Sequence, residues 1–188
     1  SPFKSVLTHG FVVDDSGRKM SKSIGNVVDP KDIIQNSGAD ILRFWIASTD
    51  FRGEMAFSKD IFDRSIDGFR RIRNTMRFMV SNLYDFDHKF EEKNLLYLDR
   101  ILLNKTKELQ EEIQKCYEEY NFHLIISKIL NFCVNDLGGL YLDVIKDRLY
   151  TMKPNSLGRK SAQYTLDKIL NTLLKAISPI LSLSLIHI

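Results

Sequence analysis

Most of this chain is patterned for long amphipathic helices. From Ser58 onward, apolar residues recur at three- and four-residue steps, the spacing that brings side chains onto one face of a helix. Short linkers separate these stretches, so neighbouring helices are expected to run antiparallel and to bury their apolar stripes against one another. We therefore predict a mainly α chain in which residues 58–181 form an antiparallel helical bundle.

Each predicted helix of this region has its own apolar stripe. Ser58 is expected to cap the first helix and Asn121 the third, since both side chains can accept hydrogen bonds from backbone N–H groups. Gly138–Gly139, inside the third helix, lowers helix stability by on the order of 1 kcal/mol per glycine, which predicts a close helix contact or a kink. The predicted inward residues are Phe62, Ile66, Phe69, Met76, Val80 and Leu83; Leu98, Leu102, Leu109, Ile113, Cys116 and Tyr120; Ile129, Cys133, Leu137, Leu140 and Val144; and, in a last helix over Leu157–Ile177, Ala162, Leu166, Ile169, Leu173 and Ile177.

The first part of the chain, residues 1–57, is predicted to be a small α/β segment. Lys4–Val13 is rich in residues that favour a pleated, buried surface and predicts a strand. Asp29–Pro30 is typical of a helix start, and Gly38 is expected to end that short helix. A second helix, over Ala39–Ser48, is apolar on most faces and is expected to be buried.

Between the predicted strand and the first helix lies a basic loop, Gly17–Asn26, with three cations and two hydroxyls. Its two glycines permit positive φ, so the backbone can turn tightly and present these groups together. Lysine offers a compact charge and serine a short hydrogen bond, which favours a phosphate ligand. A solvated basic turn is the alternative. A Walker-type phosphate loop is excluded, because it needs the lysine after the second glycine.

The helix after Ser58 also carries the densest basic surface of the chain. Guanidinium groups suit phosphate geometry, and here they lie opposite an apolar stripe, so one interpretation is contact with a nucleic-acid backbone. The other is a solvated face on which some arginines pair with neighbouring carboxylates. The cluster comprises Arg64, Arg70, Arg71, Arg73 and Arg77.

Composition sets outer limits on function. The net charge of +3 and pI of about 8.8 allow a nucleic-acid partner without requiring one. Cys116 and Cys133 lie within helical patterns and lack C-x-x-C spacing, which indicates buried thiols in a reducing compartment and no metal or disulfide role. No stretch approaches the roughly 20 apolar residues of a membrane span.

Lys19–Ser23 reads KMSKS, and this matches letter for letter the signature of class I aminoacyl-tRNA synthetases. The flanking segments resemble the bacterial-type isoleucyl-tRNA synthetases. Valyl and leucyl relatives, the alternative within this class, usually have lysine where this chain has Ile24. The resemblance extends over about residues 1–181 and is carried by Leu7–Asp14, Ser23–Asn26, Gly38–Arg43, Ala47–Met55, Arg70–Phe78 and Tyr141–Tyr150.

The resemblance implies a domain division. Residues 1–57 correspond to the C-terminal end of a catalytic nucleotide-binding domain, with the KMSKS loop and a stem-contact fold, and residues 58–181 to a helical anticodon-binding domain. Residues 182–188 depart from the family pattern and form an atypical tail. We expect the chain to be an internal segment, because it lacks an initiator Met and begins directly with strand-like sequence. The family's HIGH-type motif, amino-acid pocket, editing domain and zinc region are absent from it.

The resemblance also implies a reaction. The family activates isoleucine with ATP, accompanied by Mg²⁺, and then transfers it from the adenylate to tRNA(Ile). By resemblance, Lys22 is the main catalytic contact to the ATP phosphates and Lys19 supports it, while Ser21 and Ser23 donate to phosphate oxygens or hold the loop shape. A chain of this extent is expected to be catalytically inactive alone, and the rival interpretation is a non-catalytic helical tRNA-binding module.

The expected partners follow from the same resemblance. The tRNA backbone is expected to run along Arg70, Arg71, Arg73 and Arg77, with Lys146 and Arg148 extending the track. No resident metal and no membrane contact are expected. We expect a cytoplasmic monomer.

Overall fold

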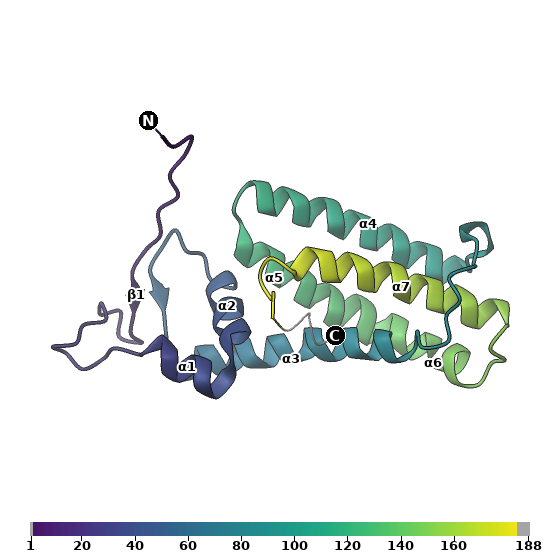
Figure 1. Ribbon diagram of the computed structural model, residues 1–188, viewed down its shortest axis with the longest axis horizontal. Helices are drawn as coiled ribbons and strands as arrows, with labels where there is room; N and C mark the ends of the chain where they lie inside the picture. The colour runs from purple at the N-terminus through teal and green to yellow at the C-terminus, as the bar shows by residue number, and fades with distance from the viewer. Residues whose placement is uncertain (1, 184–188) are drawn as a thin grey trace.

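The structure, a computed structural model, describes residues 2–183. It is mostly helical, with one small parallel sheet, so the predicted mainly α chain with a small α/β segment is confirmed (Figure 1). The elements are β1 (Val12–Val13), α1 (Pro30–Ser37), α2 (Ala39–Ala47), β2 (Met55–Ala56), α3 (Lys59–Ser81), a 3-10 turn η1 (Glu92–Asn94), α4 (Tyr97–Glu118), α5 (Phe122–Asn131), a π-helix η2 (Phe132–Tyr141), α6 (Leu142–Tyr150) and α7 (Leu157–Ile177).

The predicted strand over Lys4–Val13 is wrong in extent. Only β1 pairs, in parallel with β2, with Val12 opposite Met55 and Val13 opposite Ala56. A strand needs a neighbour to supply its hydrogen bonds, and β2 is two residues long. The preceding apolar side chains are exposed instead of buried: Val6, Leu7 and Phe11.

The two short helices form where expected. The Asp29 side chain accepts a hydrogen bond from Lys31 N at 2.8 Å, and α1 ends at Gly38, whose φ is +89°. Helix α2 buries Phe44 and Trp45. Its Arg43 donates to the carbonyl oxygens of Pro179 and Ile180, both at 2.7 Å, which ties the α/β segment to the end of α7.

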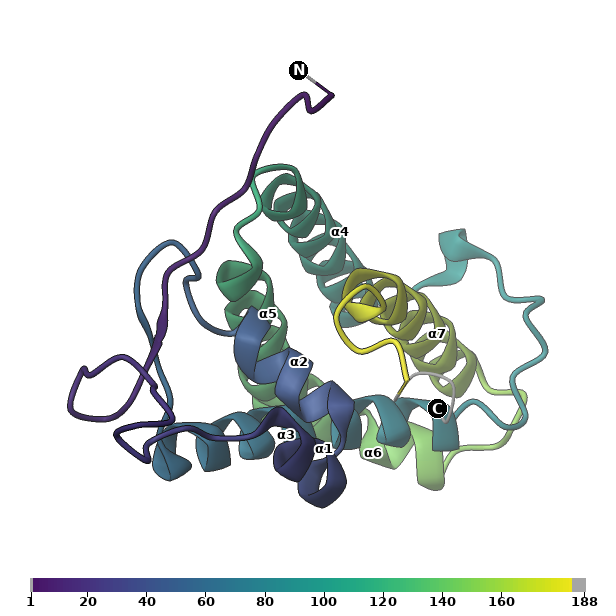
Figure 2. The ribbon, with the colours of Figure 1, turned by 60° about the vertical axis from the view of Figure 1, so that its left-hand side comes forward.

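The long helices surround a continuous core. Figures 1 and 2 show α4 and α7 side by side, with α3 and the α5–η2–α6 run beside them. The predicted last helix begins and ends at the residues expected, and all five of its predicted inward residues have 0% exposure. No helix in residues 2–183 is both long and apolar enough to cross a bilayer.

Two predicted inward positions after Cys133 are wrong, because the third long helix contains a π-helical stretch. Leu140 and Val144 are 58% and 49% exposed. In η2 the backbone turn widens to i→i+5 hydrogen bonds, so residues four apart stay on one face instead of drifting around it. The buried series therefore advances by fours: Ile125, Ile129, Cys133, Leu137, Tyr141, Ile145 and Leu149.

The Gly138–Gly139 pair lies inside this π-helix and is exposed, so the predicted close contact with another helix is wrong. A Cβ on Gly138 would lie 3.1 Å from the carbonyl oxygen of Cys133, five residues earlier. Two smaller errors concern helix ends and phase. Val80 and Tyr120 are exposed, and α3 buries Ile72 and Met79 instead.

The two cysteines are buried free thiols, as predicted. Only the start of the predicted atypical tail is described. Leu183 N lies 3.4 Å from the Asp40 carboxylate, and the Ser182 hydroxyl donates to Ser178 O at 3.3 Å. The remainder of the tail, residues 184–188, lies outside the described residues.

Candidate functional site: a braced basic loop and an arginine-rich helix

The basic loop, residues 17–26, begins beside β1. The chain turns at Gly17, where φ is +74°, and returns so that Lys19 forms an antiparallel bridge with Val13. A second turn follows at Gly25, where φ is +76°. Both glycines adopt the positive φ that the sequence predicts, and in Figures 1 and 2 the loop projects from the edge of the molecule, away from the long helices.

The carboxylate of Asp14, at the end of β1, braces this loop. It accepts hydrogen bonds from Ser16 N at 3.0 Å, from Arg18 N at 2.9 Å and from Arg18 Nε at 3.1 Å. Asn26 Nδ2 donates to it at 2.9 Å from the far end of the loop. Asn26 Oδ1 in turn accepts from Ser21 N at 2.8 Å, so the middle of the loop is tied to both ends.

These contacts lower the pKa of Asp14 to about 2, with the Asn26 hydrogen bond as the largest cause and the Arg18 backbone N–H next. A carboxylate with a lowered folded-state pKa stabilises the folded loop above its ordinary pKa of 3.8. That contribution is lost as the pH falls toward 2. The Asp14 carboxylate is therefore fully charged at neutral pH.

The four predicted phosphate-binding residues share one segment but have different surroundings. Lys22 is exposed, and its ammonium has no hydrogen bond or ion pair to any described residue. The Lys19 ammonium lies 3.7 Å from the centroid of the Phe11 ring, a cation–π contact. The hydroxyls of Ser21 and Ser23 hydrogen-bond to each other at 2.8 Å. The segment thus offers one free ammonium beside a hydroxyl pair, a donor set that suits phosphate oxygens.

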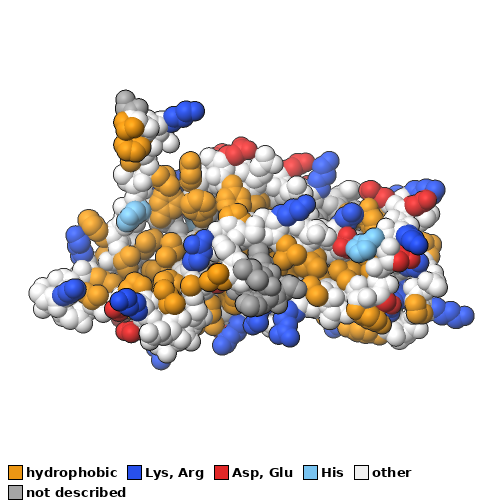
Figure 3. Space-filling model, viewed as in Figure 1, with side chains coloured by type: hydrophobic (Ala, Val, Ile, Leu, Met, Phe, Trp, Pro, Cys, Tyr) orange, Lys and Arg blue, Asp and Glu red, His pale blue; other side chains and the backbone are white. Residues whose placement is uncertain are grey.

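The arginines of α3 are all exposed but do not share one face. Arg70, Arg73 and Arg77 follow one another at three- and four-residue steps, which places them on one side of the helix. Arg64 and Arg71, seven residues apart, lie on another side. Figure 3 shows Lys and Arg side chains gathered along the lower edge of the molecule, where α3 runs in Figure 1.

The two sides border different parts of the fold. Arg70 and Arg73 line a hollow beside the junction of α1 and α2, whereas Arg64 and Arg71 line a groove against α5 and η2. Within the described part of the chain, one of the four forms an ion pair, Arg70 Nη1 with Asp67 Oδ1 at 3.7 Å, and both partners are largely exposed. An exposed pair of this kind is weak, so it leaves the guanidinium available to another anion.

Comparison of the sequence with known proteins identifies its family. Residues 1–58 match the family of class I tRNA synthetases for I, L, M and V, and residues 99–183 match the anticodon-binding domain of tRNA ligases. The isoleucine–tRNA ligase of Ruthia magnifica is 55% identical over 185 residues, which is 97% of this chain and 20% of that protein. The isoleucine–tRNA ligase of Acinetobacter baylyi is 52% identical over the same shares. The chain belongs to the isoleucine–tRNA ligase family.

The chain spans about a fifth of the length of the curated isoleucine–tRNA ligases that it matches. Solved synthetase structures share its fold at low identity. A Mycobacterium tuberculosis methionyl-tRNA synthetase in complex with methionyl-adenylate has a TM-score of 0.74 at 19% identity, covering 94% of this chain and 36% of that one. LeuRS of Agrobacterium radiobacter K84, in a ternary complex with tRNA and LeuAMS, has a TM-score of 0.70 at 19% identity, covering 93% and 21%.

One residue of the predicted tRNA track is committed to a contact in the core and does not fit an RNA-facing role. The Arg148 guanidinium is 11% exposed and donates twice, at 2.8 Å each, to the fully buried carboxylate of Asp99. Tyr141 and Ser161 donate their hydroxyl protons to the same carboxylate. A buried carboxylate needs such partners, so Arg148 is committed to the core and is removed from the track.

Lys146, the other predicted extension of the track, is exposed. Its ammonium contacts Asp143 Oδ1 at 2.5 Å, and both side chains are at least half exposed. The hydrogen bond to Asp143 is the main cause that raises the pKa of Lys146. The lysine is therefore charged and accessible on the surface of α6.

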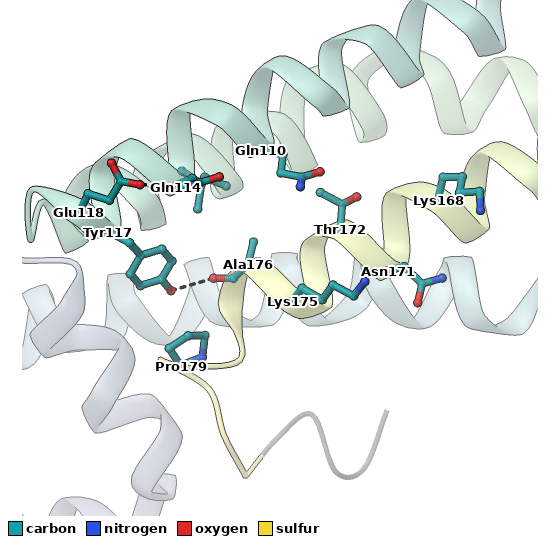
Figure 4. Close-up of a pocket in the computed structure, with 11 residues that line it drawn as sticks. Gln110, Gln114, Tyr117, Glu118, Lys168, Asn171, Thr172, Lys175, Ala176 and Pro179 are labelled. Atoms are coloured by element: carbon teal, nitrogen blue, oxygen red, sulfur yellow. Dashed lines mark hydrogen bonds between the residues drawn. The ribbon is translucent and has the colours of Figure 1, made fainter.

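A groove runs between α4 and α7 (Figure 4). Among its lining residues, the Tyr117 hydroxyl donates to Ala176 O at 2.7 Å, and burial raises the pKa of Tyr117 to about 12, so this phenol stays protonated and links the two helices. Among residues 2–183, no three His, Cys, Asp or Glu side chains are grouped as metal ligands would be. The groove is lined by amides and lysines, including Gln110, Gln114, Lys168, Asn171 and Lys175.

The two residues that shape the loop are not among the predicted site residues. Asp14 precedes the predicted basic loop, and Asn26 is its last residue. Their side chains are twelve residues apart yet meet at 2.9 Å, because the loop doubles back on β1. A carboxylate and an amide at opposite ends of a glycine-bounded loop were the available signal.

Proposed function

We propose that this chain is the part of an isoleucine–tRNA ligase that supplies the ATP-phosphate contact and the tRNA anticodon-binding domain. Residues 1–57 act as the end of the catalytic domain, with the stem-contact fold, and residues 58–181 as an antiparallel bundle that binds tRNA. The whole protein activates isoleucine with ATP and transfers it to tRNA(Ile). The observation that carries the proposal is Lys22, an exposed lysine on the braced KMSKS loop with no partner among residues 2–183.

In this function the loop works by charge neutralisation. The Lys22 ammonium meets the negative charge that develops on the ATP phosphates as the isoleucine carboxylate attacks and pyrophosphate leaves. Lys19, once it leaves the Phe11 ring, adds a second cation, and Ser21 and Ser23 donate to phosphate oxygens. Mg²⁺ accompanies ATP as part of the substrate.

The tRNA contact is proposed for the arginines of α3. Arg70, Arg73 and Arg77 form a row on one side, and Arg71 adds a cation on the next side. Guanidinium groups bind phosphates in a two-pronged geometry, which supports contact with the tRNA backbone. Lys146 is kept as a separate phosphate contact on α6. The protein is proposed to act as a cytoplasmic monomer.

The test is Lys22→Ala in the full-length protein that contains this chain. Losing one preorganised electrostatic donor is expected to slow ATP–pyrophosphate exchange by roughly 10²–10³-fold. The isoleucine concentration for half-saturation should stay unchanged. Lys107→Ala, at an exposed lysine on α4, is the matched control and should keep the parent rate. A near-parental exchange rate for Lys22→Ala would contradict the proposal.

The chain alone is expected to bind tRNA without activating isoleucine. Filter binding should detect tRNA retention by the 188-residue chain, while ATP–pyrophosphate exchange by the same preparation stays at background. Exchange activity in the isolated chain would contradict the division of labour proposed here. Absence of tRNA binding would remove the anticodon-binding role.

A further inference from the structure

Asp14 and Asn26, which lie outside the KMSKS segment, hydrogen-bond to each other and so join the two ends of the basic loop. We propose that Asp14 and Asn26 are positioning residues, which hold the loop in the shape that presents Lys22 to the ATP phosphates. This inference rests on the function proposed above. It concerns residues that touch no substrate and act only through the loop backbone.

The contacts run in an unbroken series from the sheet to Lys22. Val13 pairs with Ala56 of β2, and Phe57 N, directly after β2, donates to Val13 O at 2.9 Å. Asp14 follows Val13 directly and accepts from Asn26 Nδ2 at 2.9 Å. Asn26 then fixes the residue just before Lys22, because its Oδ1 accepts from Ser21 N at 2.8 Å.

Side-chain packing does not hold the shape of this loop. None of residues 15–25 is buried, so the loop has no apolar core of its own. Asp14, by contrast, is only 7% exposed, and its carboxylate faces four donors from three residues. A loop held by hydrogen bonds instead of packing changes shape when those bonds change, while the helical core is left intact.

The Asp14 hydrogen bonds also separate the cations of the loop into one that holds the loop and one that is left for a ligand. The Arg18 guanidinium contacts Asp14 Oδ2 at 3.0 Å, so it belongs to the brace. Lys22 has no partner among the described residues and is left for the ligand. Asp14 thus removes one cation from the phosphate-facing set and orients the segment that carries another.

The pair can be tested by exchanging its two side chains. In the full-length ligase, Asp14→Asn puts an amide N–H₂ where Asn26 and Arg18 need an acceptor. Asn26→Asp puts a carboxylate oxygen against that of Asp14. Each single change is expected to lower the rate of ATP–pyrophosphate exchange at saturating ATP by about 10–100-fold, the scale of a misplaced catalytic group.

The double variant Asp14→Asn with Asn26→Asp restores one donor facing one acceptor. It should be at least about fivefold more active than either single variant, within the coupling expected between contacting residues. The KM for isoleucine should be the same in all variants. Asp15→Asn, the same charge change one residue along at an exposed position, is the matched control and should match the parent.

A pH profile separates direct contact from general loop damage. Two carboxylates this close share a proton, which raises the pKa of one of them and restores a hydrogen bond. The rate of Asn26→Asp relative to the parent should therefore rise as the pH is lowered from about 8 to about 5.5. A ratio that does not change with pH, or a double variant no better than the singles, overturns the inference.

Folding and the underlying function are controlled separately. Circular dichroism melting and tRNA binding of each variant should equal those of the parent, because the loop is remote from the helical core. If the parent and Asp15→Asn show no ATP-dependent exchange, the proposed function fails. If they are active and the single variants are equally active, only the positioning role fails.

Discussion

The helical region and the α/β segment of this chain differ in how completely they cover their apolar residues. In α7, every predicted inward residue is fully buried. In the segment before α3, Phe3, Val6 and Phe11 are 67%, 75% and 59% exposed. Figure 3 shows the consequence, with hydrophobic side chains gathered on the surface at the α/β end of the molecule.

The difference shows that two parts of one chain can be stabilised in different ways. The helical region is held by a packed core and by buried polar groups such as Asp99 with Arg148. The α/β segment relies on a two-residue sheet, helix caps and the Asp14 hydrogen bonds. We therefore expect the helical region to carry the cooperative unfolding transition and the α/β segment to open locally at lower free energy.

The largest effect is expected from removing the buried carboxylate of Asp99. Asp99→Ala leaves the Arg148 guanidinium buried without its partner and also orphans the Tyr141 hydroxyl. The free energy of unfolding of the chain should fall by about 3–5 kcal/mol. Asp143→Ala, which removes the exposed partner of Lys146, is the control and should cost less than about 1 kcal/mol. Urea unfolding followed by circular dichroism measures both, and equal losses would refute the contrast.

The next effect compares one leucine from each region. Leu166 is fully buried in α7, and Leu166→Ala should lower the free energy of unfolding by about 2–5 kcal/mol through lost transfer energy and a cavity. Leu7 is 55% exposed, and Leu7→Ala should change it by no more than about 0.5 kcal/mol. Urea midpoints with unchanged slopes give both values. A loss above about 2 kcal/mol for Leu7→Ala would show that the α/β segment shares the core.

Where one local rule governs an element, the sequence predicts it closely. Helix α7 has a serine cap, an unbroken three–four repeat and a following proline, and its bounds and inward residues match the structure. Rules that depend on distant partners fail. The fate of the strand before Val12 depends on the length of β2, and the phase after Cys133 depends on a π-helix that the three–four repeat does not encode.

In the candidate site, too, features set by local sequence could be predicted and features set by distant partners could not. The basic loop and its glycines could be located from the sequence, because charge and turn propensity are local properties. The burial of Arg148 could not, since it depends on Asp99 from another helix, 49 positions away. The separation of Arg71 from Arg70 and Arg73 follows from helical spacing alone, and treating the cluster as one surface overlooked it.

A smaller effect is expected from the arginine row on α3. Replacing Arg70 and Arg73 by glutamine should weaken tRNA binding on the order of tenfold, or about 1.4 kcal/mol, without changing the helical signal. Each lost phosphate contact should reduce the salt slope of log K by about 0.7–0.9. Lys107→Gln with Lys115→Gln, on α4, makes the same charge change and should leave the slope alone. Filter-binding titrations in which both double variants behave alike would make these arginines structural.

The smallest effect concerns two helix caps that look alike but serve different regions. The Ser156 hydroxyl accepts from Arg159 N at 3.4 Å at the start of α7, and the Asp29 carboxylate accepts from Lys31 N at 2.8 Å at the start of α1. Ser156→Ala should lower the global free energy of unfolding by about 1 kcal/mol, because α7 unfolds with the core. Asp29→Ala should leave the global value unchanged, since α1 has no buried residue. Its cost should appear as faster hydrogen exchange of the α1 amides alone. Equal global losses for the two caps would show that α1 and α7 belong to a single cooperative unit, despite the difference in buried contacts.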